Sequence, residues 1–138
     1  MSLIKTITLN SLGDERGSLV ALESNKGGSV PFEIRRVYYI FDTKKDVARG
    51  FHAHKKLKQI AICVTGSCRF VLNDGNNKQE IILNSPTTGL VIEGMIWREM
   101  YDFSSDCVLM VLADAHYDES DYIRDYQEFL NVINQLKY

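Results

Sequence analysis

The hexapeptide Arg49-Gly50-Phe51-His52-Ala53-His54 holds two of the three histidines of this 138-residue chain. Along a β-strand, residues i and i+2 point to the same face, so His52 and His54 project together while Ala53 points away. Paired imidazoles are an unusual core filler, because histidine is only intermediate in its tendency to be buried. The alternative is two solvent-exposed or singly hydrogen-bonded histidines. We interpret the hexapeptide as a functional strand.

Short runs rich in β-branched and aromatic residues, separated by turn residues, surround this strand. Asn73-Asp74-Gly75-Asn76 is a strong hairpin turn, because Asn and Gly tolerate positive φ, and Thr65-Gly66-Ser67 is a second turn. Strands at this spacing predict a sandwich or barrel and not alternating βαβ units. The other expected strands are residues 18–23, 34–41, 60–64, 68–72, 80–83, 89–92 and 107–112.

The C-terminal segment changes its hydrophobic period from that of a strand to that of a helix. The run Asp118-Glu119-Ser120-Asp121 supplies cap candidates and negative charge for a helix start. We expect one amphipathic helix over about residues 120–137, packed on a barrel that spans about residues 5–115. The apolar positions at helical spacing are Tyr122, Ile123, Tyr126, Phe129, Leu130, Ile133 and Leu136.

Composition limits the function classes. The net charge is −2, so there is no basic excess for binding nucleic acid. Cys63, Cys68 and Cys107 lack CxxC spacing and are expected as buried free thiols, not as a disulfide framework or zinc ribbon. The N-terminus does not resemble a signal peptide, and the apolar run 108–113 is far too short to span a bilayer. We expect a cytoplasmic protein with no membrane partner.

The spacing after the histidines resembles the first motif of the cupins. Gln59 follows His54 after four residues, and Gly66 follows after six more. In metal-binding cupins the first of these positions is Glu, which binds the metal with both histidines and a later third histidine. In the matching later segment, residues 89–98, Arg98 takes the place of that histidine. Only the two histidines remain as ligands, beside the positive charge of Arg98, whereas a stable catalytic metal site usually has three or four protein ligands. We therefore predict no metal.

Without a metal, the histidine pair is suited to proton transfer. Neutral imidazole moves protons near pH 7, and two close imidazoles disfavour each other's charged form. Tyr38 and Tyr39 are adjacent on one expected strand, so only one of these candidate acids faces inward. Arginine matches phosphate oxygens with a planar fork of donors. Several arginines on or beside these strands therefore predict a phosphorylated or nucleotide-linked substrate. They are Arg36, Arg49, Arg69 and Arg98.

Five segments resemble the sugar nucleotide 3,4-ketoisomerases, which act on dTDP-4-keto-6-deoxy-D-glucose. They are residues 36–41, 49–57, 97–100, 102–107 and 117–124. The resemblance runs from about Ile7 to the final helix, and it implies one all-β domain over residues 1–138, a cupin-type jelly-roll β-barrel with a C-terminal α-helix. It also implies a ketone shift from C-4 to C-3 without metal or cofactor, in a homodimer with exchanged N-terminal strands.

The family's roles transfer to matching positions of this chain. The resemblance implies that His52 removes the C-3 proton, that His54 assists proton handling, and that Tyr38 is the acid. Arg98 and the segment Glu15-Arg16-Gly17-Ser18 are expected near the sugar, where they influence which face of C-4 receives the proton. We expect Arg16, like Arg98, to contact substrate.

Of the two possible 3-keto-6-deoxyhexose products, the galacto form is preferred over the gluco form. The resemblance implies that this product feeds an aminotransferase for a surface glycan. Three other functions compete with the isomerase. They are a same-fold 3,5-epimerase, whose His–Asp catalytic pair is not evident in the sequence, a non-catalytic sugar-binding cupin module, and a metal-dependent cupin oxygenase.

Overall fold

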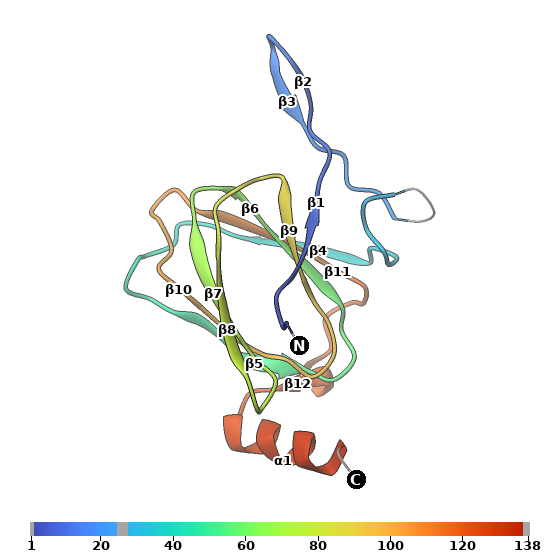
Figure 1. Ribbon diagram of the computed structural model, residues 1–138, viewed down its shortest axis with the longest axis vertical. Helices are drawn as coiled ribbons and strands as arrows, with labels where there is room; N and C mark the ends of the chain where they lie inside the picture. Colours follow the sequence, from blue (N-terminus) through green and yellow to red (C-terminus); the bar gives the residue numbers. More distant parts are fainter. Residues whose placement is uncertain (1, 25–27, 137–138) are drawn as a thin grey trace.

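Figure 1 shows the computed structural model, which describes residues 2–24 and 28–136. Two five-stranded antiparallel sheets enclose the core, and one helix lies below them at the C-terminus. The first sheet, in spatial order, contains β1 (Lys5–Thr8), β9 (Thr88–Ile92), β6 (Gln59–Thr65), β11 (Val108–Ala113) and β4 (Arg36–Ile40). The second contains β12 (Tyr122–Ile123), β5 (Arg49–His54), β10 (Trp97–Tyr101), β7 (Cys68–Asn73) and β8 (Lys78–Leu83).

Alternation along β6 shows how the sheets share the core. Ala61 and Cys63 belong to the main cluster between the sheets, while Ile60 and Ile62 belong to a second cluster with Leu9 and partly buried residues of the 20–34 segment. Because strand side chains alternate between faces, Gln59 projects into the barrel with Ala61 and Cys63. Both faces of β6 are therefore covered by other side chains, which is why its sequence is almost continuously apolar.

The expected strands match the barrel to within a few residues, but the N-terminal one does not. Residues 18–23 are not one strand: β3 (Gly17–Leu19) pairs with β2 (Leu12–Asp14) as a hairpin arm. Figure 1 shows this arm projecting from the body, and Leu12 and Leu19 on it are 64% and 58% exposed. Val20 and Leu22 leave the hairpin to pack on the outer face of the first sheet, which ends the strand.

The C-terminal helix begins later than residue 120. Residues Glu119–Asp121 form a 3₁₀ turn capped by the Asp118 side chain, and β12 then pairs with His54 and Ala53 of β5. This pairing keeps the chain extended through Ile123, so tertiary contacts override the helical period there. Helix α1 spans Tyr126–Leu136, and the Asp125 carboxylate accepts a bond from the Glu128 N–H at 3.1 Å. The expected helix end at residue 137 lies outside the described residues.

Helix α1 packs on the outer face of the histidine strand. Phe129 is fully buried and joins Ala53, Trp97 and Ile123 in one cluster. The Tyr126 hydroxyl accepts a hydrogen bond from Asn73 at 2.9 Å. The helix thus holds β5 from behind, on the side opposite the histidines.

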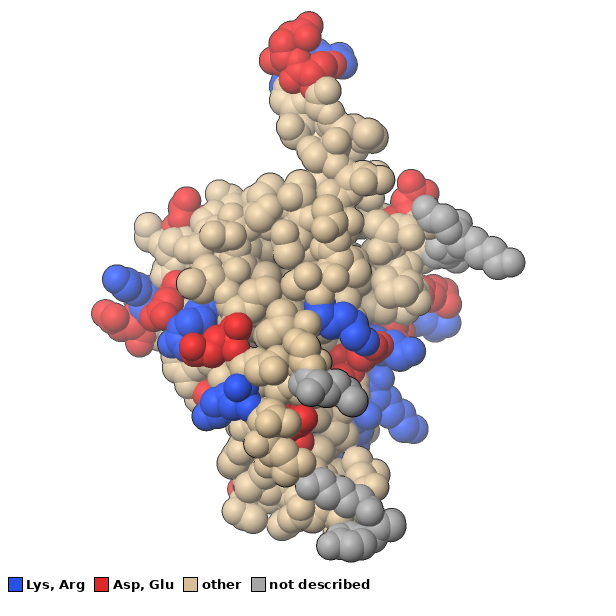
Figure 2. All heavy atoms as spheres, in the orientation of Figure 1, with Lys and Arg blue, Asp and Glu red and all other residues tan. Residues whose placement is uncertain are grey.

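The charged surface agrees with the small net charge. Figure 2 shows acidic and basic side chains intermixed on the body, with both kinds at the tip of the arm. Within residues 2–24 and 28–136, no helix is long and apolar enough to cross a membrane.

We expect Phe129→Ala to destabilise the protein by about 3–5 kcal/mol, because it empties a fully buried aromatic site. Leu136→Ala on the same helix removes a side chain that is 67% exposed, so it should change stability by less than about 0.5 kcal/mol. Chemical denaturation of both variants measures the difference. Equal stability of the two variants would contradict the packing described.

Candidate active site

A β-bulge aims the two histidines. On β10, Arg98 lies opposite His52 and Glu99 lies opposite Gly50, so Phe51 is an extra residue on β5. Gly50 and Phe51 both have positive φ, at 92° and 61°. A Cβ at Gly50 would lie 3.0 Å from the Arg98 carbonyl oxygen, so the bulge requires glycine there. Bulges re-aim side chains at functional sites, and this one turns His52 toward the barrel mouth.

The paired histidines share one face as expected. Their ring centroids lie 4.9 Å apart at an edge-to-face angle, and Ala53 points away beneath the helix. The ring of Tyr122 lies 5.0 Å from that of His52 and 4.2 Å from that of His54. His52 is half-buried, whereas His54 is 1% exposed. The histidines therefore form one aromatic cluster whose outer member reaches the open cleft.

Arg98 is a buried cation in the barrel, only 2% exposed. One guanidinium N–H donates to the Gln59 side-chain oxygen, and another donates to the Ile96 carbonyl oxygen at 3.0 Å. The Gln59 amide N–H donates in turn to the Tyr38 hydroxyl oxygen at 2.9 Å. Burial lowers the pKa of Arg98 to about 10, which leaves it charged at neutral pH. Gln59 thus links the cation to the phenol.

The environment keeps both imidazoles neutral. Burial, followed by the positive charge of Arg98, lowers the pKa of His52 to about 4. The same two causes lower the pKa of His54 to about 2. Burial raises the pKa of Tyr38, which opposes the effect of Arg98 and keeps the phenol protonated. The site therefore holds two neutral bases and one neutral acid.

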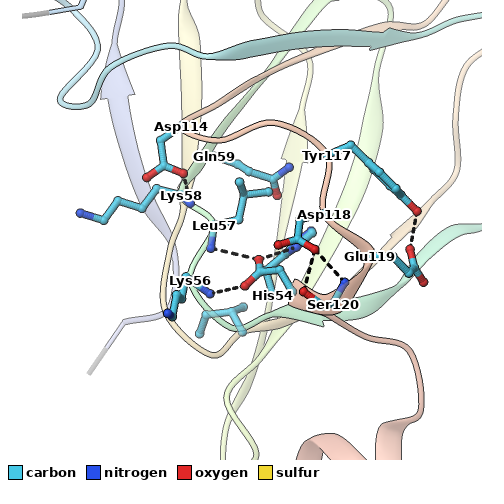
Figure 3. Close-up of polar contacts among 12 residues, drawn as sticks. His54, Lys56, Leu57, Lys58, Gln59, Asp114, Tyr117, Asp118, Glu119 and Ser120 are labelled. Atoms are coloured by element: carbon cyan, nitrogen blue, oxygen red, sulfur yellow. Dashed lines mark hydrogen bonds and ion pairs between the residues drawn. The ribbon is translucent and has the colours of Figure 1, made fainter.

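Asp121 orients His54, a role that the sequence analysis missed. Its Oδ2 lies 3.2 Å from His54 Nδ1, and its carboxylate accepts the backbone N–H groups of Lys56 and Leu57 at 2.9 and 3.2 Å. Figure 3 shows His54 beside Lys56 and Leu57, next to the 117–120 segment. A carboxylate accepts hydrogen bonds, so Nδ1 carries the proton and the buried Nε2 is the basic nitrogen. A His–Asp pair, which is not evident in the sequence, is therefore present, because folding brings together residues 67 positions apart.

A cleft of about 540 Å³ opens between β4, β5 and the 117–124 segment. Arg36 lies across the rings of Tyr38 and Tyr117, at 5.4 and 5.8 Å from their centroids. Arg124 stacks 4.1 Å from the Tyr122 ring centroid and pairs with Glu119. Aromatic faces and guanidinium groups in one cleft suit a planar, anionic ligand. The cleft is lined by Arg36, Tyr38, Ile40, Arg49, Gly50, His52, Met100, Tyr117, Tyr122 and Arg124.

The structure brings most expected site residues together but leaves two apart. Arg36, Arg49, Tyr38 and His52 line the cleft, and Arg98 lies directly below them in the barrel. Tyr39 is 64% exposed on the opposite face of β4, so Tyr38 is the inward tyrosine. Two arginines lie elsewhere in this chain: Arg69 pairs with Glu80 and Asp102, and Arg16 pairs with Asp14 on the arm.

Tyr117, Tyr122 and Arg124 were not predicted as site residues. They belong to the segment 117–124, which carries part of the family resemblance and whose residues from about 120 onward were expected to be helical. That resemblance was the signal that could have found them.

Comparisons with known proteins agree with this geometry. The family model described as "WxcM-like, C-terminal" matches residues 2–134. A TDP-4-oxo-6-deoxy-alpha-D-glucose-3,4-oxoisomerase from Aneurinibacillus thermoaerophilus is 57% identical over 132 residues, which are 96% of this chain and 94% of that protein.

Two solved structures share the fold closely. A mutant 3,4-ketoisomerase from Thermoanaerobacterium thermosaccharolyticum in complex with TDP-4-keto-6-deoxyglucose has a TM-score of 0.92 and 40% identity, covering 98% of this chain and 96% of that one. The TDP-quinovose 3,4-ketoisomerase of Campylobacter jejuni has a TM-score of 0.88 and 52% identity, covering 95% and 99%.

Fold and site together define a cupin-type barrel that is an enzyme of the isomerase class. The alternative of a non-catalytic sugar-binding module is thereby excluded. More particularly, the chain belongs to the sugar nucleotide 3,4-ketoisomerase family. The jelly-roll expectation and the family resemblance are both confirmed.

Replacing Arg98 with Gln should raise the pKa of His52 from about 4 toward its ordinary value of 6.5, because a like charge disfavours the imidazolium. Burial, the larger cause, remains in the variant, so the return is partial. Imidazole NMR titration of native and variant protein measures the shift. Arg69→Gln, which removes a cation paired outside the cleft, is the control. An unchanged His52 pKa in Arg98→Gln would contradict the electrostatics described.

Proposed function

We propose that the protein converts dTDP-4-keto-6-deoxy-D-glucose to a dTDP-3-keto-6-deoxyhexose by proton transfer, without a metal or other cofactor. The observation that carries this proposal is the pair of neutral imidazoles beside a protonated phenol at the base of an arginine-lined cleft. Two relatives support the choice of substrate: one is named for the TDP-4-oxo sugar, and the other was crystallised with the TDP-4-keto sugar, which is the same compound.

The proposed reaction uses the acidity of a proton next to a ketone. His52 removes the C-3 proton while the Tyr38 hydroxyl donates to the C-4 oxygen, which gives an enediol. The C-3 hydroxyl then returns a proton to the Tyr38 phenolate, while C-4 takes a proton from the His52 imidazolium, whose N–H exchanges with solvent, so the ketone moves without net oxidation. Gln59 donates to the Tyr38 oxygen, which leaves the phenolic proton free for the sugar. His54, whose basic nitrogen is Nε2, assists this proton handling.

Charge makes this chemistry possible at neutral pH. An imidazole with a pKa of about 4 is a weak base in the free enzyme. We infer that the diphosphate, bound by Arg36, Arg49 and Arg124, raises the pKa of His52 toward the working pH, because an opposite charge favours imidazolium. Arg98 would stabilise the negative charge that develops on the enediolate, since a preorganised buried cation needs no reorganisation.

The absence of a metal requirement rests on residue types. Gln59 offers a neutral amide where a cupin metal site has a carboxylate, and the Arg98 guanidinium occupies the place of a third histidine. A fixed cation beside two imidazoles opposes binding of a second cation. This argument weighs against the oxygenase.

The arm suggests how two chains cooperate. Its exposed leucines, Leu12 and Leu19, and its distance from the body in Figure 1 suit contact with a second copy. We propose a homodimer in which the arms are exchanged and Arg16 reaches the partner's cleft. This arrangement gives Arg16 the substrate contact expected for it.

The configuration of the product at C-4 is a second question. The sequence-based expectation is the galacto form, and it stays a prediction. The relative at 52% identity is named for quinovose, a 6-deoxyglucose, which favours the gluco form instead. In either case the 3-ketone is the group that an aminotransferase converts to an amine, which supports the proposed place in deoxyaminosugar synthesis.

Incubation with dTDP-4-keto-6-deoxyglucose in D₂O, followed by NMR, tests the activity. We expect a C-3 ketone with deuterium at C-4. A parallel reaction in H₂O keeps H-4, whose coupling to H-5 identifies the galacto or gluco product. His52→Asn should lower turnover by about 10²–10⁴-fold while dTDP binding survives. His116→Asn, at the remaining, exposed histidine, is the matched control. Deuterium at C-5 would indicate the epimerase, and full activity of His52→Asn would remove His52 as the base.

We expect Asp121→Asn to lower kcat about 10- to 100-fold with little change in KM, because an amide no longer enforces the Nδ1–H tautomer of His54. The His54 ring signals in NMR should show the tautomer change. Asp118→Asn is the control, since that carboxylate caps the same turn through Ser120. Equal kcat values for the two variants would leave Asp121 with a structural role only.

A further inference from the structure

Three cysteine thiols meet inside the barrel, away from the cleft. Cys63 lies near the end of β6, Cys68 begins β7, and Cys107 immediately precedes β11. All three are free and at most 1% exposed. Their sulfur atoms lie within 4.8 Å of one another, and the Cys63 and Cys107 sulfurs are 3.7 Å apart. Within residues 2–24 and 28–136, this is the only group of three or more His, Cys, Asp or Glu side chains close enough to share an ion.

The backbone holds the three thiols in place. The turn between β6 and β7 is pinned to the loop before Cys107, because the Ser67 N–H donates to the Ser104 hydroxyl and the Ser104 N–H donates to the Ser67 carbonyl, both at 2.9 Å. Gly66 has a φ of +74°, and a Cβ there would lie 2.7 Å from the Cys107 Cα. Two segments about 40 residues apart in sequence are thus locked together, and the thiol cluster is formed before any ligand arrives.

The cluster is separate from the proton-transfer site. Cys63 lies on the same inward face of β6 as Gln59, four residues further along, which is about 13 Å at ~3.3 Å per residue. None of the three cysteines lines the cleft. The ketoisomerase reaction therefore leaves them without a role.

The surroundings select the charge of a ligand. The thiols pack among apolar side chains that include Phe70, Phe103 and Leu109. Burial raises the pKa of the Cys107 thiol, and the negative charge of nearby Asp106 adds to this effect. A buried net negative charge is unfavourable without a cationic partner. Three thiolates around Zn²⁺ carry −1 and around Cu⁺ carry −2, whereas three thiolates around a trivalent ion are neutral.

We propose that Cys63, Cys68 and Cys107 form a binding site for a soft trivalent ion, delivered as an uncharged hydroxide such as arsenous acid. Thiolate is a soft ligand that favours such ions. Zinc–sulfur bonds of about 2.3 Å in tetrahedral directions span sulfur pairs about 3.8 Å apart, and a pyramidal trivalent centre holds its three sulfurs somewhat closer together. The Cys63–Cys107 separation of 3.7 Å already fits this geometry. Small side-chain rotations bring the third sulfur into range.

The binding reaction balances without an oxidant or reductant. Three As–O bonds of As(OH)₃ break and three As–S bonds form, while the three thiol protons leave with the hydroxides as water. Arsenic stays trivalent throughout.

Sodium arsenite is the probe, added to the native enzyme kept reduced with a phosphine, since dithiol reductants bind arsenite themselves. We expect one arsenic per chain by native mass spectrometry, with loss of three hydrogens. X-ray absorption should show three sulfur neighbours and no oxygen. These measurements on the native chain do not depend on whether a variant folds.

Variants locate the site. Each single change, Cys63→Ala, Cys68→Ala or Cys107→Ala, should weaken arsenite binding at least ~100-fold, because a third tethered ligand is lost. Leu83→Val, in the same core and opposite Cys68 on β8, keeps all three thiols and should bind within about threefold of native.

Three results would overturn the proposal. They are no arsenite bound to the folded enzyme, two sulfur neighbours with an oxygen, or tighter binding of Zn²⁺, added as zinc chloride, than of arsenite. Because none of these measurements uses the sugar nucleotide, failure here would leave the proposed isomerase untouched.

Discussion

The site depends on one charge, the buried guanidinium of Arg98. A cation inside a barrel is unfavourable unless hydrogen bonds and counter-charges compensate it. Here it has the Gln59 side-chain oxygen and the Ile96 carbonyl oxygen, while its buried Nε has no hydrogen-bond partner among residues 2–24 and 28–136. The free enzyme thus holds an under-compensated positive charge directly below the cleft. An anionic substrate, or an enediolate formed from it, is the natural complement.

The same charge sets the protonation of its neighbours. It lowers the pKa of both histidines, in the same direction as burial, and it opposes burial at Tyr38. Proton abstraction requires neutral imidazole, and proton donation requires intact phenol. One buried cation therefore prepares the bases, while burial preserves the acid, and Gln59 connects the two halves of the site.

Backbone geometry converts this electrostatic arrangement into a directed one. The bulge at Gly50 and Phe51 rotates β5 so that His52 faces the cleft, and Ala53 then packs against Phe129 behind the strand. Tyr122 on β12 closes the other side of the imidazole pair. Because β12 and α1 follow each other directly, the C-terminal segment both supports the histidine strand and completes the site.

Much of this molecule could be predicted from local patterns. The period-two runs and the turn residues indicated most of the barrel strands, because those signals depend on neighbours in the chain. The His-x-His spacing, with Gln59 and Arg98 at the other cupin positions, indicated proton-transfer chemistry. Alternation along the strand left Tyr38 and Tyr39 open as the acid, and the family resemblance selected Tyr38. The arm at residues 12–19 was missed, since its pairing is a hairpin that packs on no core of its own chain.

The sequence by itself determined that the chain is a β-barrel carrying two imidazoles on one face, because alternation along a strand is a local property. Only the tertiary structure decided that Asp121 fixes the His54 tautomer, that residues 122–123 are a strand and not a helix, and that Cys63, Cys68 and Cys107 converge. Each of these depends on contacts between segments about 40 to 70 residues apart. Pairing with β5 outweighs the helical period of the C-terminal segment, and no local pattern encodes that balance.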